Sequence, residues 1–377
     1  MSRVKFGDVV KDVKINIDRL NNPYEYYVAG DHMDSEDLTI HRKGCFTTDD
    51  VGPAFIRVFK PGQILYGSRR TYLKKIAVAD FEGVCANTTF VFETKDPHAF
   101  EQRLLPFIML SKDFTTWSIA KSKGSTNPYV LFSDLADFEF ELPPLEEQKV
   151  LVDKLWAAYR LKEAYKKLLV ATDEMVKSQF VEMFGNTPMS YEMQDCFSLI
   201  RNGANIKQGQ FEGGIPITRI ETISDEIVDR QKMGYAGIAD NKYELYYLQD
   251  GDILISHINS LKHIGKCALY NKKENESIIH GMNLLCLRPN IVTINPVFAI
   301  HMLRSNIIRK GITDITKPAV NQASFSAKDF GKLRTIIPPM DKQMLFVSIA
   351  EQADKSKFEL KQCIENIDKV IKSLING

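Results

Sequence analysis

The chain has 377 residues, more than one hydrophobic core usually organises, so we expect two or more domains. Its hydrophobic content of 44% and charged content of 26% are ordinary for a globular protein, and no apolar run approaches the roughly 20 residues that a membrane-spanning helix needs. The formal net charge is only +1, which excludes a strongly basic protein and limits any nucleic-acid surface to a local patch.

The cysteines and the first residues point to a cytoplasmic protein. All six cysteines occur singly, without a CxxC pair, which argues against a zinc ribbon or a disulfide framework and fits a reducing compartment. The opening MSRVKFGDVV lacks the apolar core of a signal peptide.

Residues 1–142 predict a first globular domain with a strand at Thr88–Glu93 and a helix at Pro106–Lys112. Between Asp50 and Asp80 there is no acidic residue, and the stretch YGSRRTYLKK, residues 66–75, mixes aromatic, hydroxyl and cationic side chains. Such cations neutralise phosphates, and arginine reads guanine in the major groove. The candidate DNA-binding residues here are Tyr66, Ser68, Arg69, Arg70, Tyr72, Lys74 and Lys75, joined by Lys123 and Asn127 from the loop 121–127. Taken alone, the basic stretch is more typical of a solvated loop than of a DNA-binding surface.

Residues 143–185 predict a long helix that begins after Pro143-Pro144 and ends before Gly185. Its apolar residues recur at intervals of three and four, which is the seam of a coiled coil or helix pair. The predicted interface residues are Leu155, Ala158, Tyr165, Leu169 and Val176. The seam is interrupted by Lys162, Thr172 and Gln179, and polar seam residues fix register and orientation.

Residues 186–337 echo the first domain, with strands at Asp252–Ile255 and Leu284–Leu287 and a helix at Pro296–Arg309. DGDILISH, residues 250–257, matches PGQILYGS, residues 61–68, and a second acid-free interval follows between Asp252 and Glu274. A charge bias placed twice at corresponding positions favours a DNA-binding role. The candidates are His257, Asn259, Ser260, Lys262, His263 and Lys266, with Lys317, Asn321 and Gln322 from the loop 317–322. Because the side chains differ between the halves, the two domains would read different sequences.

Residues 338–377 repeat the junction and the long helix. Pro338-Pro339 and Gln343 lie 195 residues after Pro143-Pro144 and Gln148. The second seam is cleaner than the first and is interrupted only by Lys357. Its predicted interface residues are Ala350, Ala353, Leu360, Ile364, Ile367, Ile371 and Leu374. Two helices of this length with one apolar stripe each are expected to pack on one another, although two unrelated surface helices would show a similar pattern. The predicted fold is a mixed α+β (α/β) chain with two tandem domains separated by an antiparallel two-helix coiled coil and an internal pseudo-twofold duplication.

The absence of a complete catalytic or metal-binding motif predicts a binding protein with no active site and no metal site of its own. The sequence has no GxxxxGK[ST] loop and no GxGxxG after a strand. Thr126-Asn127-Pro128-Tyr129 lacks one proline of the amino-methyltransferase motif, and Glu147-Gln148-Lys149 has a nuclease-like ending at a helix start. Both are better explained as chance matches, since neither has the accompanying motif that the chemistry requires.

The repeated hydrophobic–Pro-Pro–x–x–x–Gln junction, the helix after each junction and the domain before each helix resemble the DNA-specificity subunit of type I restriction-modification systems. The second junction has Lys342 where the first has Glu147. The resemblance implies that each domain reads one half of a bipartite site in double-stranded DNA and that the helix pair sets the spacer. It also implies two methyltransferase subunits that carry S-adenosylmethionine, and restriction subunits that use ATP and Mg²⁺.

Two other classes stay open. A non-catalytic scaffold with two protein-binding domains would explain the helices, and its basic loops would only be solvated. A self-contained modification enzyme would need the cofactor motif that the sequence lacks.

Overall fold

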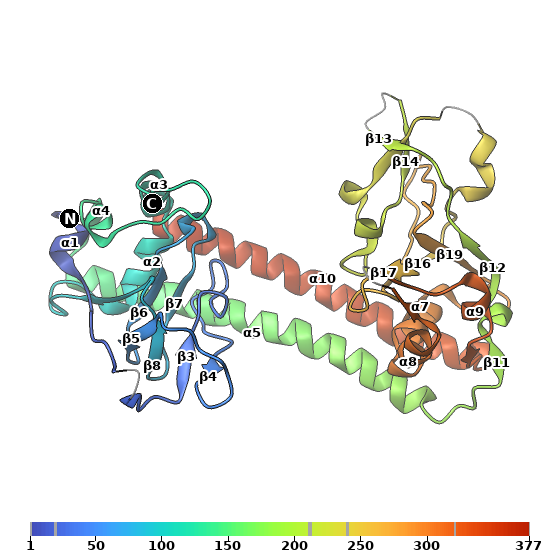
Figure 1. The fold of residues 1–377 in the computed structure, drawn as a ribbon, viewed down its shortest axis with the longest axis horizontal. Helices are drawn as coiled ribbons and strands as arrows, with labels where there is room; N and C mark the ends of the chain where they lie inside the picture. Colours follow the sequence, from blue (N-terminus) through green and yellow to red (C-terminus); the bar gives the residue numbers. More distant parts are fainter. Residues whose placement is uncertain (1, 19–20, 210–212, 239–240, 320–321, 377) are drawn as a thin grey trace. The chain divides into compact units, whose positions relative to one another are not determined.

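The computed structural model describes residues 2–18, 21–209, 213–238, 241–319 and 322–376. The chain forms two compact units, unit 1 with Met1–Lys166 and Lys361–Gly377, and unit 2 with Lys167–Leu360. Each unit holds one globular part together with a portion of both long helices, α5 (Leu145–Phe184) and α10 (Met340–Asn376) (Figure 1). Within the described ranges, no helix has the length and apolar character needed to cross a membrane.

Unit 1 is built on a four-stranded antiparallel sheet. Its order is β2 (Val10–Asp12), β9 (Thr89–Thr94), β6 (Ile64–Gly67) and β7 (Ile76–Val78). A second sheet has the order β4 (Gly44–Cys45), β3 (Tyr26–Val28), β8 (Gly83–Ala86) and β5 (Phe55–Phe59), with β3 and β8 parallel. β1 (Ser2–Lys5) pairs with β10 (Glu139–Leu142). The helices are α1 (Phe6–Val9), α2 (Leu105–Leu110), α3 (Lys112–Ala120) and α4 (Phe132–Ala136), with 3-10 turns at Thr71–Leu73 and Gln102–Leu104.

Unit 2 repeats the main sheet with the same strand order. It consists of β12 (Phe197–Asn202), β19 (Leu284–Pro289), β16 (Ile253–Ser256) and β18 (Cys267–Leu269). β11 (Tyr191–Glu192) pairs with β22 (Arg334–Thr335), and the helices are α6 (Met193–Cys196), α7 (Pro296–Arg304), α8 (Asn306–Ile315) and α9 (Ala327–Gly331). The 3-10 turns cover Ile220–Ile223, Arg230–Lys232 and Asn241–Tyr246.

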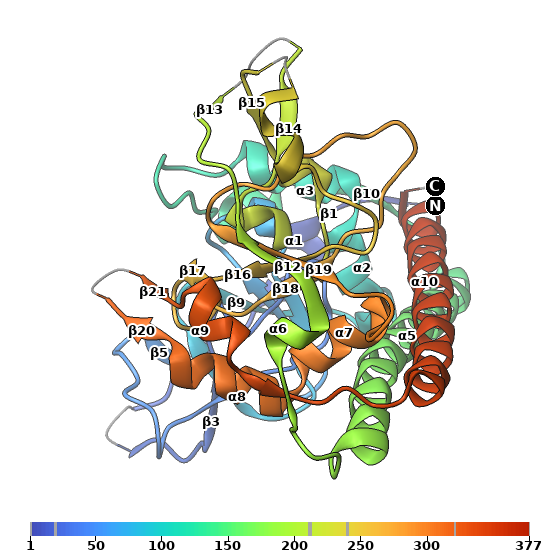
Figure 2. The ribbon, with the colours of Figure 1, turned by 90° about the vertical axis from the view of Figure 1, so that its right-hand side faces the viewer.

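The halves differ in their second sheets. In unit 2 this sheet has only three strands, β13 (Gln208–Gly209), β15 (Gly234–Ala236) and β14 (Ile215–Ile217), and it stands away from the main sheet (Figure 2). A further small sheet is formed by β17 (Ile258–Asn259), β21 (Ala323–Ser324) and β20 (Lys317–Pro318). A shared main sheet therefore carries different additions in the two units.

Two predicted helices are interrupted by serines. The helix predicted over Pro296–Arg309 breaks at Ser305, whose backbone is extended (φ −64°, ψ 149°) and whose hydroxyl accepts a hydrogen bond from the Ile308 amide. Likewise, the helix predicted over Pro106–Lys112 ends before Ser111, whose hydroxyl caps the unpredicted α3 by accepting from the Phe114 amide. A serine side chain satisfies the free amides at a helix start, so it favours a new helix over continuation of the old one.

The long helices pack within each unit through the predicted seams. In unit 1, Leu155 and Ala158 share an apolar cluster with Ile367, Ile371 and Leu374. In unit 2, Val176 shares a cluster with Ala350 and Ala353 and with the aromatic residues Phe180, Phe184 and Phe346. The predicted interface residues nearest the middle of the helices are half-buried; they are Tyr165, Leu169, Leu360 and Ile364.

The two lysines that interrupt the seams form matching ion pairs. In unit 1, Lys162 Nζ lies 2.6 Å from Asp368 Oδ1, and in unit 2, Lys357 Nζ lies 2.7 Å from Asp173 Oδ1. From the first pair to the second, the residue number rises along α5 from 162 to 173 and falls along α10 from 368 to 357, so the helices are antiparallel. Lys357 and Asp368 lie 195 positions after Lys162 and Asp173, respectively (357 − 162 and 368 − 173), so each pair is the repeat of the other. The predicted fold class, with its duplication and antiparallel helix pair, is confirmed.

Candidate nucleic-acid interface

The two basic segments predicted in unit 1 lie against each other. Residues 69, 129 and 123 form consecutive antiparallel bridges, Arg69 with Tyr129 and Tyr129 with Lys123. The Arg70 amide donates to Pro128 O at 2.6 Å. The segments 66–75 and 121–129 therefore form one surface of unit 1, although about 50 residues separate them in the sequence.

The cations on this surface differ in how they are held. Arg69 and Arg70 are exposed, and no carboxylate among the described residues pairs with either. Lys74 pairs with Glu36, Lys75 donates to Gly30 O, and the exposed Lys123 lies 2.9 Å from Asp134. The two arginines are therefore the cations of the predicted set that are available to a phosphate or a base edge. Tyr72, 53% exposed, and the exposed Asn127 complete the set on this surface.

The backbone around these arginines is strained. Arg70 has a φ of 50° and Lys74 a φ of 47°, and both residues are in the left-handed region that non-glycine side chains rarely adopt. They flank the 3-10 turn Thr71–Leu73, whose buried Thr71 hydroxyl lies 3.0 Å from Ser122 Oγ. Strain of this kind persists where the surrounding structure holds it, and it is frequent at binding sites.

Two predicted DNA-binding residues of unit 1 face the interior, so their assignment is corrected. Tyr66 is 2% exposed and lies among the rings of Phe90, Phe92 and Phe114, where burial raises its pKa to about 12. Ser68 is 7% exposed and donates its hydroxyl to Thr88 O at 2.5 Å. Residues of a buried strand alternate between faces, and these side chains support the surface without forming part of it.

Unit 2 brings its two predicted segments together in the same way. In the small sheet, Ile258 pairs with Ser324, Asn259 with Ala323 and Lys317 with Ser324. This order, with the third segment in the centre, repeats the bridges at 69, 129 and 123 in unit 1. Each unit therefore presents one such three-stranded ladder, and we call the two the reading ladders.

Most predicted residues of unit 2 lie on or beside its ladder. The exposed residues are Ser260, Lys262, Lys317 and Gln322, and the half-buried residues are Asn259, His263 and Lys266. Asn259 Nδ2 donates to Ser256 Oγ at 3.1 Å, and Lys266 Nζ donates to Ser224 O at 2.7 Å. Asn321 lies outside the described residues.

The assignment of His257 is also corrected. The ring is 5% exposed, packs against Phe325 and is held neutral by burial, which lowers its pKa to about 4. It hydrogen-bonds the backbone of Asn283, just as Ser68 in unit 1 binds the backbone of Thr88. Both residues therefore fasten the start of a reading ladder to the main sheet.

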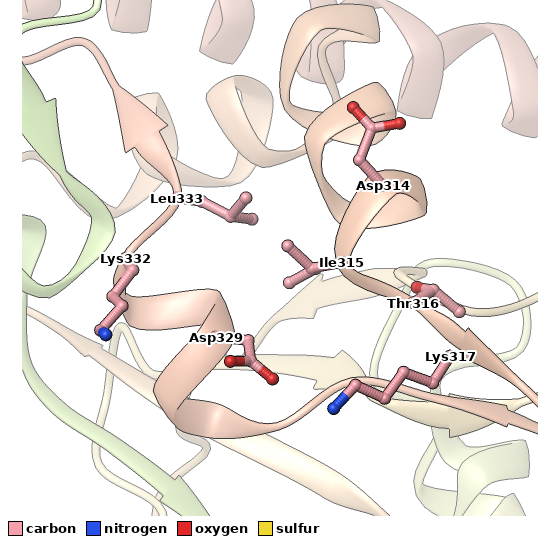
Figure 3. Close-up of a pocket in the computed structure, with 7 residues that line it drawn as sticks. All are labelled: Asp314, Ile315, Thr316, Lys317, Asp329, Lys332 and Leu333. Atoms are coloured by element: carbon pink, nitrogen blue, oxygen red, sulfur yellow. The ribbon is translucent and has the colours of Figure 1, made fainter.

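A cavity of about 420 Å³ lies beside the ladder of unit 2. Figure 3 shows Lys317 and Lys332 on different sides of it, with Asp329 between them and Asp314 above. The opposite charges of these four side chains balance, and α8 directs its carbonyl end toward the cavity. The cavity therefore has no marked preference for an anion.

The strongest metal-like cluster already holds a cation. Asp37, His41 and Glu163 place one ligand atom each within 4.8 Å of one another. Lys166 Nζ lies 3.0 Å from Asp37 Oδ2 and 2.8 Å from Glu163 Oε1, so its ammonium group pairs with both carboxylates and occupies the position between them. The cluster is complete as an ion-pair network of side chains.

The glutamine of each junction has a role that the sequence did not reveal. Gln148 is fully buried; its Oε1 accepts from the Glu101 amide at 2.9 Å, and its Nε2 donates to Ala99 O at 2.9 Å and Pro143 O at 2.8 Å. The recurrence of this glutamine 195 residues later marked the junction in the sequence, but its backbone partners lie about 50 residues away along the chain and no local pattern links them.

Gln343 repeats these contacts in unit 2. It is also fully buried, accepts from the Asn295 amide at 2.9 Å, and donates to Thr293 O at 2.9 Å and Pro338 O at 2.8 Å. Each glutamine therefore fastens the first turn of a long helix to the globular part of its own unit.

Comparison with known proteins identifies relatives of both halves. The family model for the type I restriction modification DNA specificity domain matches residues 19–169 and 189–369. A putative type I restriction enzyme MjaX specificity subunit from Methanocaldococcus jannaschii is 41% identical over 187 residues, 49% of this chain and 43% of that protein. The EcoKI specificity subunit from Escherichia coli K12 is 21% identical over 257 residues, 62% of this chain and 55% of that protein. The chain thus spans about half the length of these relatives.

Solved structures show the same fold. A chain from a type I restriction-modification system, described for its complex assembly and conformational transition, superposes with a TM-score of 0.60 at 19% identity, covering 99% of this chain and 96% of that one. The S subunit from M. genitalium gives a TM-score of 0.52 at 14% identity, with coverage of 99% and 94%. Because the family model matches most of both halves, the chain belongs to the type I restriction modification DNA specificity family.

Proposed function

We propose that this chain is the DNA-binding specificity subunit of a type I restriction-modification complex. Each globular part reads one half of a bipartite DNA site through its reading ladder, and the α5–α10 pair sets the spacer between the half-sites. The observation that carries the proposal is the reading ladder itself, which occurs once in each unit and presents exposed cations beside polar side chains.

The ladder of unit 1 suits a duplex that presents both phosphates and guanines. Arg69 and Arg70 are exposed without a carboxylate partner among the described residues, so binding a phosphate does not require an existing ion pair to break. Arginine donates two parallel hydrogen bonds to guanine O6 and N7, and it also neutralises phosphates.

The ladder of unit 2 has the same backbone but other side chains. Its exposed cations are Lys262 and Lys317, and the polar groups beside them are Ser260 and Gln322. Lysine acts as a point charge, whereas arginine has a planar fork of donors, so the two ladders favour different base edges. This difference supports an asymmetric site with two unlike half-sites.

The helix pair supports the role of a spacer. Two apolar clusters and the reciprocal pairs Lys162–Asp368 and Lys357–Asp173 define one antiparallel register. A helix pair with a fixed register has a fixed length, because each residue adds about 1.5 Å along a helix.

The catalytic work belongs to partners in this proposal. Two methyltransferase subunits bind the duplicated halves, carry S-adenosylmethionine and methylate adenine at N6, and restriction subunits that use ATP and Mg²⁺ join them. The chain itself supplies no catalytic residue and binds no cofactor.

Methylome sequencing tests the proposal in cells that carry the methyltransferase with and without this chain. We expect a bipartite adenine motif that disappears with the chain. The double variant Arg69→Ala/Arg70→Ala then relaxes one half of the motif and leaves the other intact, whereas Arg160→Ala, an exposed arginine of α5, changes neither half.

Purified protein gives a second test. Binding of the wild-type chain to a duplex containing the motif weakens steeply with salt, and losing two phosphate contacts reduces the magnitude of the slope of log K against log salt by about 2. Unchanged methylomes, together with no duplex binding even when the methyltransferase is present, would instead identify a protein-binding scaffold.

A further inference from the structure

We propose that Tyr159 of α5 is a positioning residue that holds the reading ladder of unit 1 in place through Asp37, an inference that rests on the proposed function. The connection runs through residues 35–39, which we call the clamp segment. The hydrogen bonds and ion pairs of this connection all lie inside unit 1.

The clamp segment is fastened to α5 at one phenol group. Tyr159 Oη is 2.6 Å from Asp37 Oδ1, to which it donates a hydrogen bond, and it accepts a hydrogen bond from the Leu38 amide at 2.8 Å. The hydroxyl of Thr39 lies 3.2 Å from the same oxygen. Tyr159 is 5% exposed and Asp37 6% exposed, so the phenol meets three groups in a site nearly closed to water.

Asp37 is held as a carboxylate by the groups around it. Burial disfavours its charged form, but hydrogen bonds from Tyr159, the Thr39 amide and Lys166 outweigh burial and lower its pKa to about 2. Asp37 Oδ2 also lies 3.2 Å from His41 Nε2, and Glu163 holds the far side of Lys166. Removing one donor from such a site leaves a buried charge with less compensation, which costs far more than losing an exposed hydrogen bond.

The other side of the clamp segment touches the basic stretch. Glu36 donates its amide to Lys74 O at 3.1 Å and pairs with the Lys74 ammonium, while Ser35 bridges Lys75. Leu38 O accepts from the Val78 amide at 2.9 Å. Lys74 follows the 3-10 turn Thr71–Leu73, and Arg70, the other residue with a left-handed backbone, precedes it. A shift of the clamp segment is therefore passed to the backbone that carries the two exposed arginines.

In unit 2, a segment with a similar backbone lies beside the residues that follow β17. Glu226, like Glu36, has a left-handed backbone, with a φ of 59°, and Lys266 donates to Ser224 O two residues before it. Its carboxylate pairs with Arg309 of α8 at 2.6 Å and with Arg304 of α7 at 3.4 Å. Both arginines belong to helices of the globular part, and neither ion pair involves α5 or α10.

Because of this difference, we expect that a substitution can disturb one reading ladder and leave the other unchanged. In unit 1 the clamp segment is bonded to a residue of the long helix, whereas in unit 2 the segment around Glu226 is paired with two arginines of the globular part. Tyr159→Phe deletes one oxygen and keeps the ring, and Glu226→Gln deletes one charge and keeps the shape, so the variants form a matched pair.

The experiment measures sequence discrimination by the full chain in complex with its methyltransferase. Duplexes carry the wild-type motif or a single base change in one half-site, and the Arg69→Ala/Arg70→Ala variant identifies which half unit 1 reads. The readout is the ratio of affinities for intact and altered half-sites, measured well below the melting temperature of each variant. We expect Tyr159→Phe to reduce this ratio roughly two- to tenfold for the half-site of unit 1 only, about the factor that one net hydrogen bond is worth, because phenylalanine lacks the oxygen that meets Asp37, Leu38 and Thr39.

The matched variant and a second substitution secure the interpretation. Glu226→Gln should reduce discrimination at the other half-site only, and Asp37→Asn, which retains size but loses the charge, should reproduce the effect of Tyr159→Phe. A simple loss of stability would instead weaken both half-sites together. Unchanged discrimination at the first half-site in folded Tyr159→Phe and Asp37→Asn chains would overturn the inference, whereas a wild-type complex that distinguishes no half-site would overturn the proposed function and the inference with it.

Discussion

Replacing the junction glutamine of unit 1 with leucine should detach the start of α5 from its globular part. Gln148 is fully buried and satisfies three backbone groups, the Glu101 amide and the carbonyls of Ala99 and Pro143. Leucine has similar bulk but no polar atom, so all three groups lose their hydrogen bonds to the side chain. At about 1–3 kcal/mol for each buried group left unpaired, partly offset by the apolar side chain, the net cost is about 3 kcal/mol.

Hydrogen exchange measures this loss of free energy at a single backbone amide. The Glu101 amide donates directly to Gln148, so we expect its exchange to accelerate roughly 100-fold in Gln148→Leu, the factor that corresponds to about 3 kcal/mol. Gln343→Leu is the matched control, because it frees the Asn295 amide in the same way and leaves Glu101 protected. If the Glu101 amide exchanged at the wild-type rate in Gln148→Leu, the hydrogen bonds of Gln148 would not hold the start of α5 to the globular part.

Three further predictions concern the helices and the clamp. Lys162→Asp should lower the free energy of unfolding by about 1 kcal/mol, because it places a second negative charge beside Asp368. Adding Asp368→Lys should restore most of this loss in a double-mutant cycle, and the pair Lys357 and Asp173 should behave in the same way. Asp37 has a folded pKa of about 2 against 3.8 for the free side chain, so it contributes roughly 2 kcal/mol of stability above pH 4, and this contribution is lost as the pH falls toward 2. A flatter acid-unfolding curve for Asp37→Asn in this pH range checks the sign. A seven-residue insertion in both helices should lengthen the DNA spacer by about 3 base pairs, since one heptad adds about 10 Å, and a methylome with the original spacing would contradict the spacer role.

Periodicity and duplication were strong enough in the sequence to predict the architecture. The seam residues Leu155, Ile371, Val176 and Ala350 repeat at intervals set by helix geometry, and that spacing holds whatever the helices pack against. The short strands and the serine-capped helix breaks were harder to predict. Ser305 lies in an otherwise continuous helical pattern, and only the structure, with its extended backbone and its hydroxyl bond to the Ile308 amide, shows that one helix ends and another begins there.

The candidate surface was predicted in part. Charge bias located the segments, and the structure brings each pair of segments together in a ladder. Composition could not separate the exposed Arg69 from the buried Tyr66, because the two lie only three residues apart and strand direction decides which faces water. The buried Asp37 was missed for a related reason, since its partner Tyr159 lies 122 residues away and no local pattern links them.

The junction glutamines bind only main-chain groups, and this has a consequence for how such a chain can change. Apart from the proline before each helix, Gln148 meets the backbone at 99 and 101, and Gln343 meets the backbone at 293 and 295. Any side chain that preserves the local backbone is compatible with those bonds. Substitutions can therefore accumulate across either globular part, and new target preferences can arise, while the glutamine still fastens that globular part to the start of the long helix.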